Sequence, residues 1–473
     1  MTDAVLGDAT LPWLADRLAV PAYDRSGAPG VVHLGLGAFH RAHQALVFDA
    51  LLRQGDGRWG VHAFAMRQPA VAQALAQQQG WYTVRIGSAD GQHWVLGGAL
   101  WRMGVAAQSP AQVHAAIATP ATRWVTLTVT EKGYGPGLTE LLVEGLARRR
   151  LAGLLGLTIA SCDNLVHNGS RLRAQCLGLA QARDPALADW IAQQVCFPNS
   201  MVDRIVPAAS PELLQAAQDT LGLRDAAALG TEAFWEWVIE DHLADPADAQ
   251  ALAAQGVRVV ADVAPFEEAK LRLLNGSHSA MAAMGAVLGL PCISDCVAQP
   301  QIRQFVHDLM TDEVGPGLQR TDWPAYRDQL LHRFANPTLR HRVHQIATDS
   351  SQKIPQRWPP SVLPHLQQGR VPQRLAFAAA AWMRSLRGVD EAGQAYTLDD
   401  PLADMLQALA RRHAGDAPAT VQALGTLPAI WGTELPQHTA WLAAVTQALQ
   451  AIDHLGLLAA LTALHAAAHQ GQP

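Results

Sequence analysis

The pattern of hydrophobic residues changes near residue 263, and this change most constrains the fold of the 473-residue chain. Before it, short runs of β-branched and aromatic residues alternate with helical periodicity, which is typical of a parallel, doubly wound sheet. From Pro265 onward almost every segment has helical periodicity. Because one hydrophobic core rarely serves a chain of this length, we predict two domains: an α/β domain over residues 1–263 and a mostly α-helical domain over residues 264–473.

Individual elements follow from the same runs. We expect strands at Val31–Leu34, Gly60–Met66, Tyr82–Ile86, Trp94–Leu96, Trp124–Thr130, Leu157–Ser161 and Val257–Val263. Between them, helices are expected at Ala42–Arg53, Gln68–Gln79 and Ala111–Ala118. The plainest helices of the second domain are predicted at Leu375–Leu386, Pro401–His413 and Thr439–Ala468.

Composition argues against several classes of protein. Hydrophobic residues make up 49% of the chain and charged residues 16%, as in globular proteins, and a net charge of −6 argues against a dedicated nucleic-acid binder. The five cysteines form no C-x-x-C pair, and the first residues lack a signal-peptide pattern. The longest apolar run, Ala280 to Ile293, is shorter than the roughly 18 residues of a membrane span. We therefore expect a cytoplasmic protein with neither nucleic-acid nor membrane partners.

A glycine-rich turn follows the first predicted strand. The run Gly35-Leu36-Gly37-Ala38-Phe39-His40 has the first two glycines of a dinucleotide fingerprint and a histidine in place of the third. Such glycines allow a tight turn and a close approach of backbone N–H groups to a pyrophosphate. Taken alone, the run fits a Rossmann-type nucleotide site and an ordinary βα turn equally well. No obvious acid follows for the ribose, and Arg67 stands near that position, so both NAD and NADP stay open.

His40 and His43, with His33 nearby, are the histidines that most suggest a metal. The spacing H-x-x-H without a third ligand is weak evidence for one. We expect no metal, and we interpret His40 as a residue at the start of a helix, close to the nucleotide.

The segment Glu267–His278 brings a lysine, a carboxamide and an imidazole into three helical turns. At about 100° per residue, with Lys270 at zero, His278 falls near 80°, Asn275 near 140° and Glu267 near 60°. One broad face can present all four. The other interpretation is a surface helix with scattered polar groups.

These groups suit the oxidation of an alcohol without a metal. A lysine can remove the hydroxyl proton if burial lowers its pKa to about 7 to 8. Carboxamide N–H groups can stabilise the alkoxide that develops.

Five separated motifs resemble, in their order, those of the mannitol dehydrogenase family of polyol-specific long-chain dehydrogenases. They are Gly35–His43, Thr128–Tyr134, Ser161–Asn164, Met201–Pro207 and Lys270–His278. The stretches Thr130–Tyr134, Ser351–Arg357 and Gly388–Asp390 make the chain most similar to the fructuronate reductase (mannonate oxidoreductase) branch.

This resemblance implies a zinc-independent dehydrogenase with a Rossmann-type N-terminal domain, a helical C-terminal domain and an active site between them. It implies that Lys270 is the base, that Asn164 and Asn275 hold the reacting oxygen, and that His278 binds substrate. Asp203 matches a polar position near the substrate, and Glu267 a carboxylate associated with proton exit. The cofactor is expected to be NAD, at Gly35, Leu36, Gly37, Ala38, Phe39, His40, Arg67, Thr130 and Glu131.

Within the family, we predict D-mannonate and D-fructuronate as substrates. Their carboxylate would be bound by cations between Arg340 and Arg357, since arginine forks bind carboxylates well. The expected residues are Arg342, Lys353 and Arg357. Gln345 stands where mannitol-specific members tend to carry arginine, and Ser350 where the family usually has glycine, so the chemistry is better indicated than the substrate.

Two other functions stay open. One is a mannitol 2-dehydrogenase or another polyol dehydrogenase that acts on D-mannitol, D-fructose or D-arabinitol. The other is a protein without activity that senses NAD(H) or binds sugars. The resemblance favours a monomer with small-molecule partners.

Overall fold

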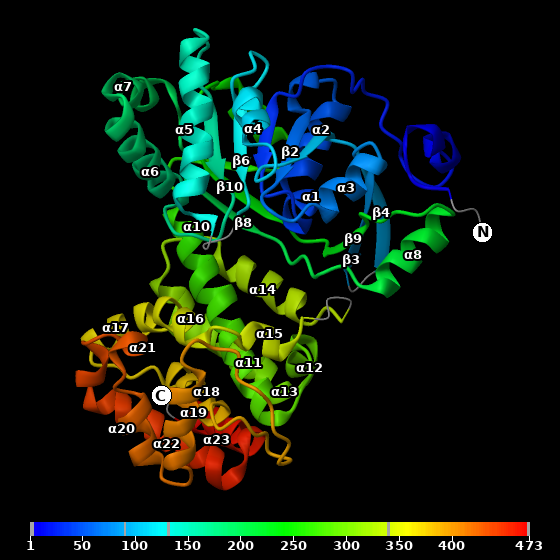
Figure 1. Ribbon diagram of the computed structural model, residues 1–473. Helices are drawn as coiled ribbons and strands as arrows, with labels where there is room; N and C mark the ends of the chain where they lie inside the picture. The colour runs from blue at the N-terminus through cyan, green and yellow to red at the C-terminus, as the bar shows by residue number, and fades with distance from the viewer. Residues whose placement is uncertain (1–3, 89–90, 130–132, 338–340, 471–473) are drawn as a thin grey trace. The chain divides into compact units, whose positions relative to one another are not determined.

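The computed structural model describes residues 4–88, 91–129, 133–337 and 341–470. The chain forms two compact units, Met1–Ala264 and Pro265–Pro473 (Figure 1). Among the described residues, no helix combines the length and the apolar character that a membrane crossing requires.

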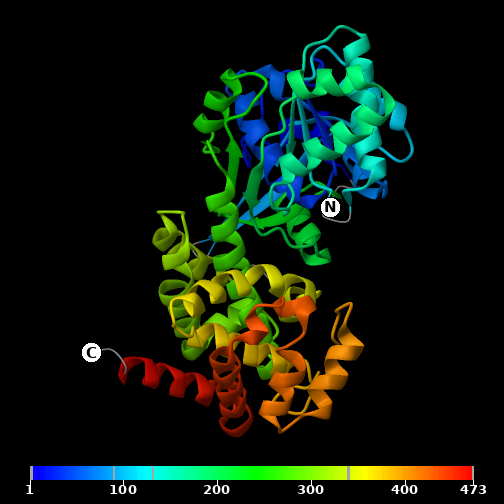
Figure 2. The same ribbon diagram turned by 90° about the vertical axis from the view of Figure 1, so that its left-hand side faces the viewer.

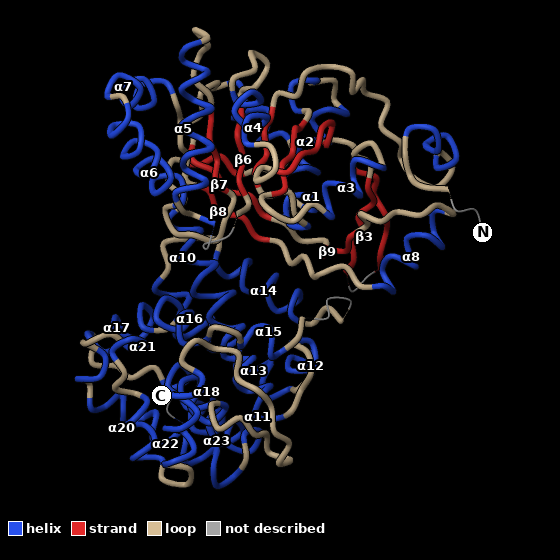
Figure 3. The backbone as a smooth tube through the Cα atoms, viewed as in Figure 1, coloured by secondary structure: helices blue, strands red, loops and turns tan. Residues whose placement is uncertain are grey.

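The first unit is built on a five-stranded parallel sheet with the order β5-β2-β1-β6-β7 (Figure 3). Its strands are β1 (Val31–Leu34), β2 (Val61–Ala65), β5 (Leu100–Val105), β6 (Trp124–Leu127) and β7 (Thr158–Ser161). Strands β1, β6 and β7 are buried along their whole length. Continuous burial is typical of parallel sheets that carry helices on both faces.

Helices cover both faces of this sheet. Successive strand residues point to opposite faces, so adjacent residues of one strand pack into different cores. Val31 belongs to the same hydrophobic core as Phe48 of α2, whereas Val32 belongs to a second core with Leu142 of α5. The helices of this unit are α1 (Ala38–Ala42), α2 (Gln44–Arg53), α3 (Ala70–Gln77), α4 (Pro110–Ile117), α5 (Pro136–Leu151), α6 (Asn168–Arg183), α7 (Pro185–Gln194), α8 (Pro211–Leu221) and α9 (Ala247–Ala254). Short 3-10 helices are η1 (Asp8–Leu14) and η2 (Gly57–Trp59).

The remaining strands form two smaller sheets, with the orders β4-β3-β9 and β11-β10-β8. They are β3 (Tyr82–Ser88), β4 (Gly91–Gly97), β8 (Ser200–Asp203), β9 (Leu229–Glu232), β10 (Glu236–Glu240) and β11 (Arg258–Val260). The strands predicted near residues 82 and 94 therefore lie outside the parallel sheet and pair antiparallel. Only two residues separate them, which is too short for a parallel crossover.

The second unit is helical. Its elements are α10 (Ala264–Ala269), η4 (Lys270–Asn275), α11 (Gly276–Leu288), α12 (Ile293–Ala298), α13 (Pro300–Asp308), η5 (Leu309–Val314), η6 (Gly315–Gly317), α14 (Trp323–Phe334), α15 (Val343–Ala347), α16 (Ser350–Arg357), α17 (Pro359–Gln367), α18 (Gln373–Ser385), α19 (Ala403–Arg412), α20 (Ala417–Leu424), α21 (Pro428–Trp431), η7 (Leu435–Gln437), α22 (Thr439–Leu455) and α23 (Leu457–Gln470). Of these, η4 and η5 are π-helical turns, and η6 and η7 are 3-10.

Helices α11 and α18 form the centre of this unit and pack against each other. The long apolar run seen in the sequence lies in α11 as far as Leu288, and α11 is buried over most of its length. The prediction of a single helix over Thr439–Ala468 is wrong. Gly456 ends α22 with φ +80°, and α23 turns away from α22 (Figure 2). Glycine adopts this conformation without the strain that a Cβ would bring.

Candidate active site

One helical segment of the second unit carries Glu267, Lys270, Asn275 and His278. Glu267 lies in α10, Lys270 begins the π turn η4, Asn275 ends it, and His278 lies in the first turn of α11. The N–H of Gly276 bonds to the carbonyl of Leu271, five residues earlier, which is the hydrogen bond that defines a π-helix.

This π turn corrects the angles expected for an unbroken α-helix. It holds about one residue more than an α turn, so every later residue lags by about one α-helical position. With this lag, Asn275 lies where the fourth residue after Lys270 would lie in a regular α-helix, and His278 lies where the seventh would lie. Glu267 precedes the π turn and stays three positions before Lys270. At about 100° per position, all three fall within about 60° of the lysine. The four side chains therefore form one narrow stripe.

The stripe is mostly buried. The exposed fraction is 9% for Lys270 and Glu267 and 5% for His278, and Asn275 is half-buried. Removal of water penalises the charged form of an amine and strengthens every hydrogen bond to a developing charge. Both effects are conditions for proton transfer by a lysine.

Helix α16 and the residue that follows it bond to the end of this segment. The guanidinium of Arg357 donates from Nη1 to the carbonyl of Asn275 at 3.1 Å and to the hydroxyl of Ser279 at 2.7 Å. Trp358 donates from its indole N–H to the carbonyl of Gly276 at 3.1 Å. One turn earlier, the ammonium of Lys353 donates to the carbonyl of Ile346 at 3.3 Å.

An imidazole pair supports the stripe. The ring of His278 packs edge-on against His341 at a centroid distance of 5.1 Å, and Phe334 lies 4.7 Å from it. Burial, followed by the positive charges of Arg333 and Lys353, lowers the pKa of His341 to about 4. His341 is therefore neutral near pH 7, and the positive charges of Arg333 and Lys353 lie close enough to act on it.

The sequence-based choice of residues missed Arg333 and His341. Arg333 is buried, with 5% of its surface exposed, and only its position in α14 brings it to the pair. A signal was present for His341, which stands between Arg340 and Arg342 in the cation-rich stretch. By contrast, the predicted residue Arg342 is exposed and pairs through its backbone with Cys292; among the described residues no hydrogen bond or ion pair links its side chain to the stripe.

In the first unit, the glycine-rich turn lies where β1 ends. Gly35 has φ +104°, and a Cβ there would stand 2.2 Å from the carbonyl of Thr128 beyond β6. The N–H groups of Gly35 and Leu36 both donate to the carbonyl of Phe64, which fixes the turn beside β2. A Cβ on Gly37 would meet, among described atoms, only the Gly35 carbonyl at 3.6 Å. Open space beside Gly37 fits the close approach of a dinucleotide phosphate.

Histidines fill the interior behind this turn. His40 is fully buried and stacks on His33 with a centroid distance of 3.4 Å, and His33 bonds to the hydroxyls of Thr126 and Thr128 at 2.9 and 3.0 Å. Burial lowers the pKa of His33 to about 3 and that of His40 well below its usual value. The side chain of His40 therefore supports the turn, which leaves its backbone for a role at the nucleotide.

Three more predicted residues follow strands of the first unit. Arg67 is exposed just after β2, Asn164 is exposed after β7, and Asp203 is buried at the end of β8. Carboxyl ends of parallel strands share one edge of a sheet, so Arg67 and Asn164 lie at the same edge as the glycine turn. Thr130, Glu131 and Arg340 fall outside the described residues.

The loop that carries Asn164 is held by its neighbours. The carboxylate of Asp163 accepts the Val129 N–H at 3.1 Å and the Tyr134 hydroxyl at 3.2 Å. The side-chain amide of Asn168 donates to the Asp163 carbonyl at 3.1 Å. A carboxamide after β7 is therefore presented from a fixed backbone.

Two family models match most of the chain. The mannitol dehydrogenase Rossmann domain matches residues 29–249, and the mannitol dehydrogenase C-terminal domain matches residues 262–453. The chain belongs to the mannitol dehydrogenase family. The predicted fold class and family are confirmed, and membership makes the protein an oxidoreductase.

Relatives of this mannitol dehydrogenase family member differ in the substrates they are named for. It is 40% identical to D-mannonate oxidoreductase of Escherichia coli (strain K12), over 97% of this chain and 99% of the relative. Identity to mannitol 2-dehydrogenase of Aspergillus terreus (strain NIH 2624 / FGSC A1156) is 36%, over 94% and 95%. A solved structure of the Pseudomonas fluorescens mannitol 2-dehydrogenase ternary complex with NAD and D-mannitol matches with a TM-score of 0.83 and 31% identity, over 98% and 99%.

Proposed function

We propose that this protein interconverts D-mannonate and D-fructuronate by hydride transfer with NAD(H), without a metal, and with Lys270 as general acid and base. The stripe of Glu267, Lys270, Asn275 and His278 carries this proposal, because it holds an amine, an amide and an imidazole on one buried face. The cofactor is NAD. The open, glycine-lined edge of the first unit fits it, and use of NADP at Arg67 is the alternative.

In the oxidative direction, the amine of Lys270 takes the proton of the substrate hydroxyl. The side-chain N–H groups of Asn275 and Asn164 donate to the oxygen as negative charge develops, and loss of one such donor typically costs about 2.7 to 4 kcal/mol of barrier. NAD, when bound at the turn of Gly35 and Gly37, would supply the acceptor for the hydride that leaves the carbon. In the reductive direction, Lys270 returns the proton to the oxygen.

The remaining roles follow the same arrangement. His278, seven α-helical positions from Lys270 once the π turn is allowed for, is proposed to bind a substrate hydroxyl. Glu267, one turn before Lys270, is proposed to receive the proton from the lysine. Asp203 is proposed as a further polar contact of the substrate.

A charged substrate is supported by the cations near the stripe. Arg333 and Lys353 both act on His341, which contacts His278. Arg333 is buried and Lys353 is half-buried; cations removed from bulk water attract a carboxylate strongly and give no such advantage to a neutral polyol. We assign the carboxylate to Lys353 first, and keep Arg342 as a second contact. The enzyme is proposed to be a cytoplasmic monomer.

The second candidate is a mannitol 2-dehydrogenase, which the 36% identity to the fungal enzyme favours. A steady-state assay that follows the absorbance of the reduced cofactor separates the two. We expect kcat/KM for D-mannonate to exceed that for D-mannitol by at least about 10-fold, and D-fructuronate to exceed D-fructose likewise, with no loss of rate after treatment with a chelator. A preference for the neutral pair would overturn the substrate assignment, and no turnover of any of the four would favour a sensor.

A further inference from the structure

The end of α16 contacts the backbone of the segment that carries Lys270 and Asn275. Arg357 bonds to the carbonyl of Asn275 and to Ser279, and Trp358 bonds to the carbonyl of Gly276. Both carbonyls lie where the π turn passes into α11. The two donors are adjacent in the chain and reach two adjacent acceptors.

A π turn needs such support because its wider spacing is less favourable than that of an α-helix and is rarely extended. Without outside contacts, a segment here would gain by returning to regular α-helical bonding. That change would move His278 and Asn275 by about 100° around the helix axis relative to Lys270. The bonds from Arg357 and Trp358 hold the carbonyls at the point where this rearrangement would begin.

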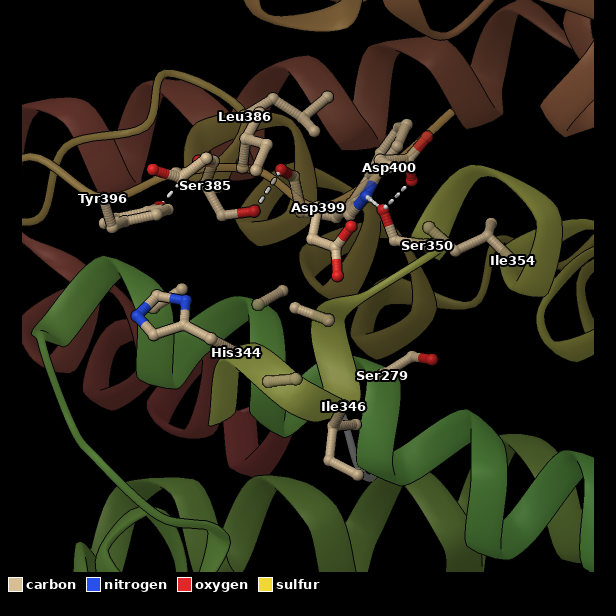
Figure 4. Close-up of a pocket in the computed structure, with 17 residues that line it drawn as sticks. Ser279, His344, Ile346, Ser350, Ile354, Ser385, Leu386, Tyr396, Asp399 and Asp400 are labelled. Atoms are coloured by element: carbon tan, nitrogen blue, oxygen red, sulfur yellow. Dashed lines mark hydrogen bonds between the residues drawn. The ribbon is translucent and has the colours of Figure 1, made fainter. Parts of the chain in front are cut away.

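Helices α11 and α16 contact each other, and a cavity lies next to these bonds. It is lined by Ser279, Ala282 and Ala283 of α11, by Ser350 and Ile354 of α16, and by residues of α15, α18 and the segment 396–400 (Figure 4). Small side chains on this face of α11 make fewer van der Waals contacts than large ones would. The hydrogen bonds at the end of α16 therefore add a directional connection at this point.

We propose that Arg357 and Trp358 are positioning residues that hold the π turn in register, so that Lys270, Asn275 and His278 share one stripe. This assigns Arg357 to the backbone of the catalytic segment instead of to the substrate carboxylate. The inference rests on the proposed function, since it presumes that the stripe performs the reaction.

Substitution of Arg357 distinguishes positioning from carboxylate binding, because only the second depends on substrate charge. In Arg357→Ala we expect kcat to fall about 10- to 100-fold, as misplacement of reacting groups typically produces. The fall should be equal for D-mannonate and for whichever neutral polyol shows turnover, with KM within about 2-fold. Arg357→Lys, which keeps a donor, should recover part of kcat. Arg370→Ala is the matched control, because Arg370 is exposed and, within the part of the chain that the structure describes, its side chain bonds only locally, to Gln368.

Trp358→Phe provides a second test that changes no charge. It removes the N–H that reaches Gly276 and keeps a ring in the buried site. We expect kcat to fall about 3- to 10-fold on every substrate, in line with the loss of one hydrogen bond. A rise in KM confined to D-mannonate in Arg357→Ala would overturn the proposal, and so would unchanged kcat in both variants.

Amide hydrogen exchange separates failure of this inference from failure of the proposed function. In Arg357→Ala the amides of residues 270–279 should exchange at least about 10-fold faster than in Arg370→Ala, whatever the substrate proves to be. If the wild-type protein turned over none of the sugars but exchange rose as expected, the assigned reaction would be wrong and the positioning role would stand. Unchanged exchange would overturn the positioning role even in an active enzyme.

Discussion

Two turns carry the chemistry assigned to this protein, and they are built in opposite ways. The glycine turn after β1 clears space by omitting side chains at Gly35 and Gly37, and the carbonyl of Phe64 holds it beside β2. The π turn at Lys270–Asn275 adds a residue to a helix, and it is bonded from outside by α16. Local residue type defines the first turn, whereas a distant helix supports the second.

A pair of imidazole rings also packs beside each turn. His33 and His40 stack behind the glycine turn, and His341 meets His278 edge-on beside the π turn. Burial lowers the pKa of His33, His40 and His341. These three rings are therefore neutral near pH 7, and positive charges act on both pairs, Arg41 on His40 and Arg333 with Lys353 on His341.

Among substitutions at the two turns, Lys270→Ala should cause the largest loss of turnover. Without the amine, the base proposed to take the hydroxyl proton is missing, so turnover should fall by at least about 10³-fold. The Kd for NAD, which is proposed to bind at the glycine turn, should be unchanged in a fluorescence titration. Wild-type turnover in the variant would remove Lys270 from the role of base.

Asn275→Ala should have the next largest effect. Loss of one amide donor to the developing alkoxide predicts a fall in kcat of about 10²- to 10³-fold. The backbone carbonyl that Arg357 contacts is retained, so the π turn should persist and the melting temperature should change little. An unchanged kcat in steady-state assays would exclude the amide from this role.

Gly35→Ala tests whether the first turn depends only on local residue type. The left-handed conformation alone costs an alanine about 1 to 2 kcal/mol, and the 2.2 Å approach to the Thr128 carbonyl adds to this. We expect a total loss of at least about 3 kcal/mol in urea unfolding and a weaker Kd for NAD. Gly55→Ala is the control, since Gly55 has φ +94° and no described atom near its Cβ position; equal losses in the two variants would refute the steric argument.

His341→Gln should give the smallest effect, visible only in acid. Because the folded pKa of about 4 lies below the usual 6.5, the neutral ring contributes fully to stability above pH 6.5, and this contribution is lost as pH falls towards 4. From pH 7 to 5, wild type should lose about 2 kcal/mol more than the variant. Unfolding by urea at both pH values measures this, with His332→Gln, at an exposed position, as control. Parallel losses in wild type and His341→Gln would show that the ring is not buried as described.

Much of the first unit could be predicted because its signals are local. The runs at Val31–Leu34 and Trp124–Leu127 form parallel strands, and Gly35 adopts the conformation that its residue type favours. Pairing was less predictable, since the strands near residues 82 and 94 joined a separate sheet. A strand pattern specifies which face is buried but not which neighbour it meets.

The residues of the stripe could likewise be chosen from the sequence, since Lys270, Asn275 and His278 stand in a recognisable order. Regular α-helical spacing predicts one broad face for them, with Asn275 near 140° from the lysine, and only the π turn narrows this face to a stripe. That turn is stabilised by Arg357 and Trp358, more than 80 residues further along the chain. Residue type and local spacing determine which groups are available, whereas the phase of the helix that presents them depends on contacts that form only when distant segments pack together.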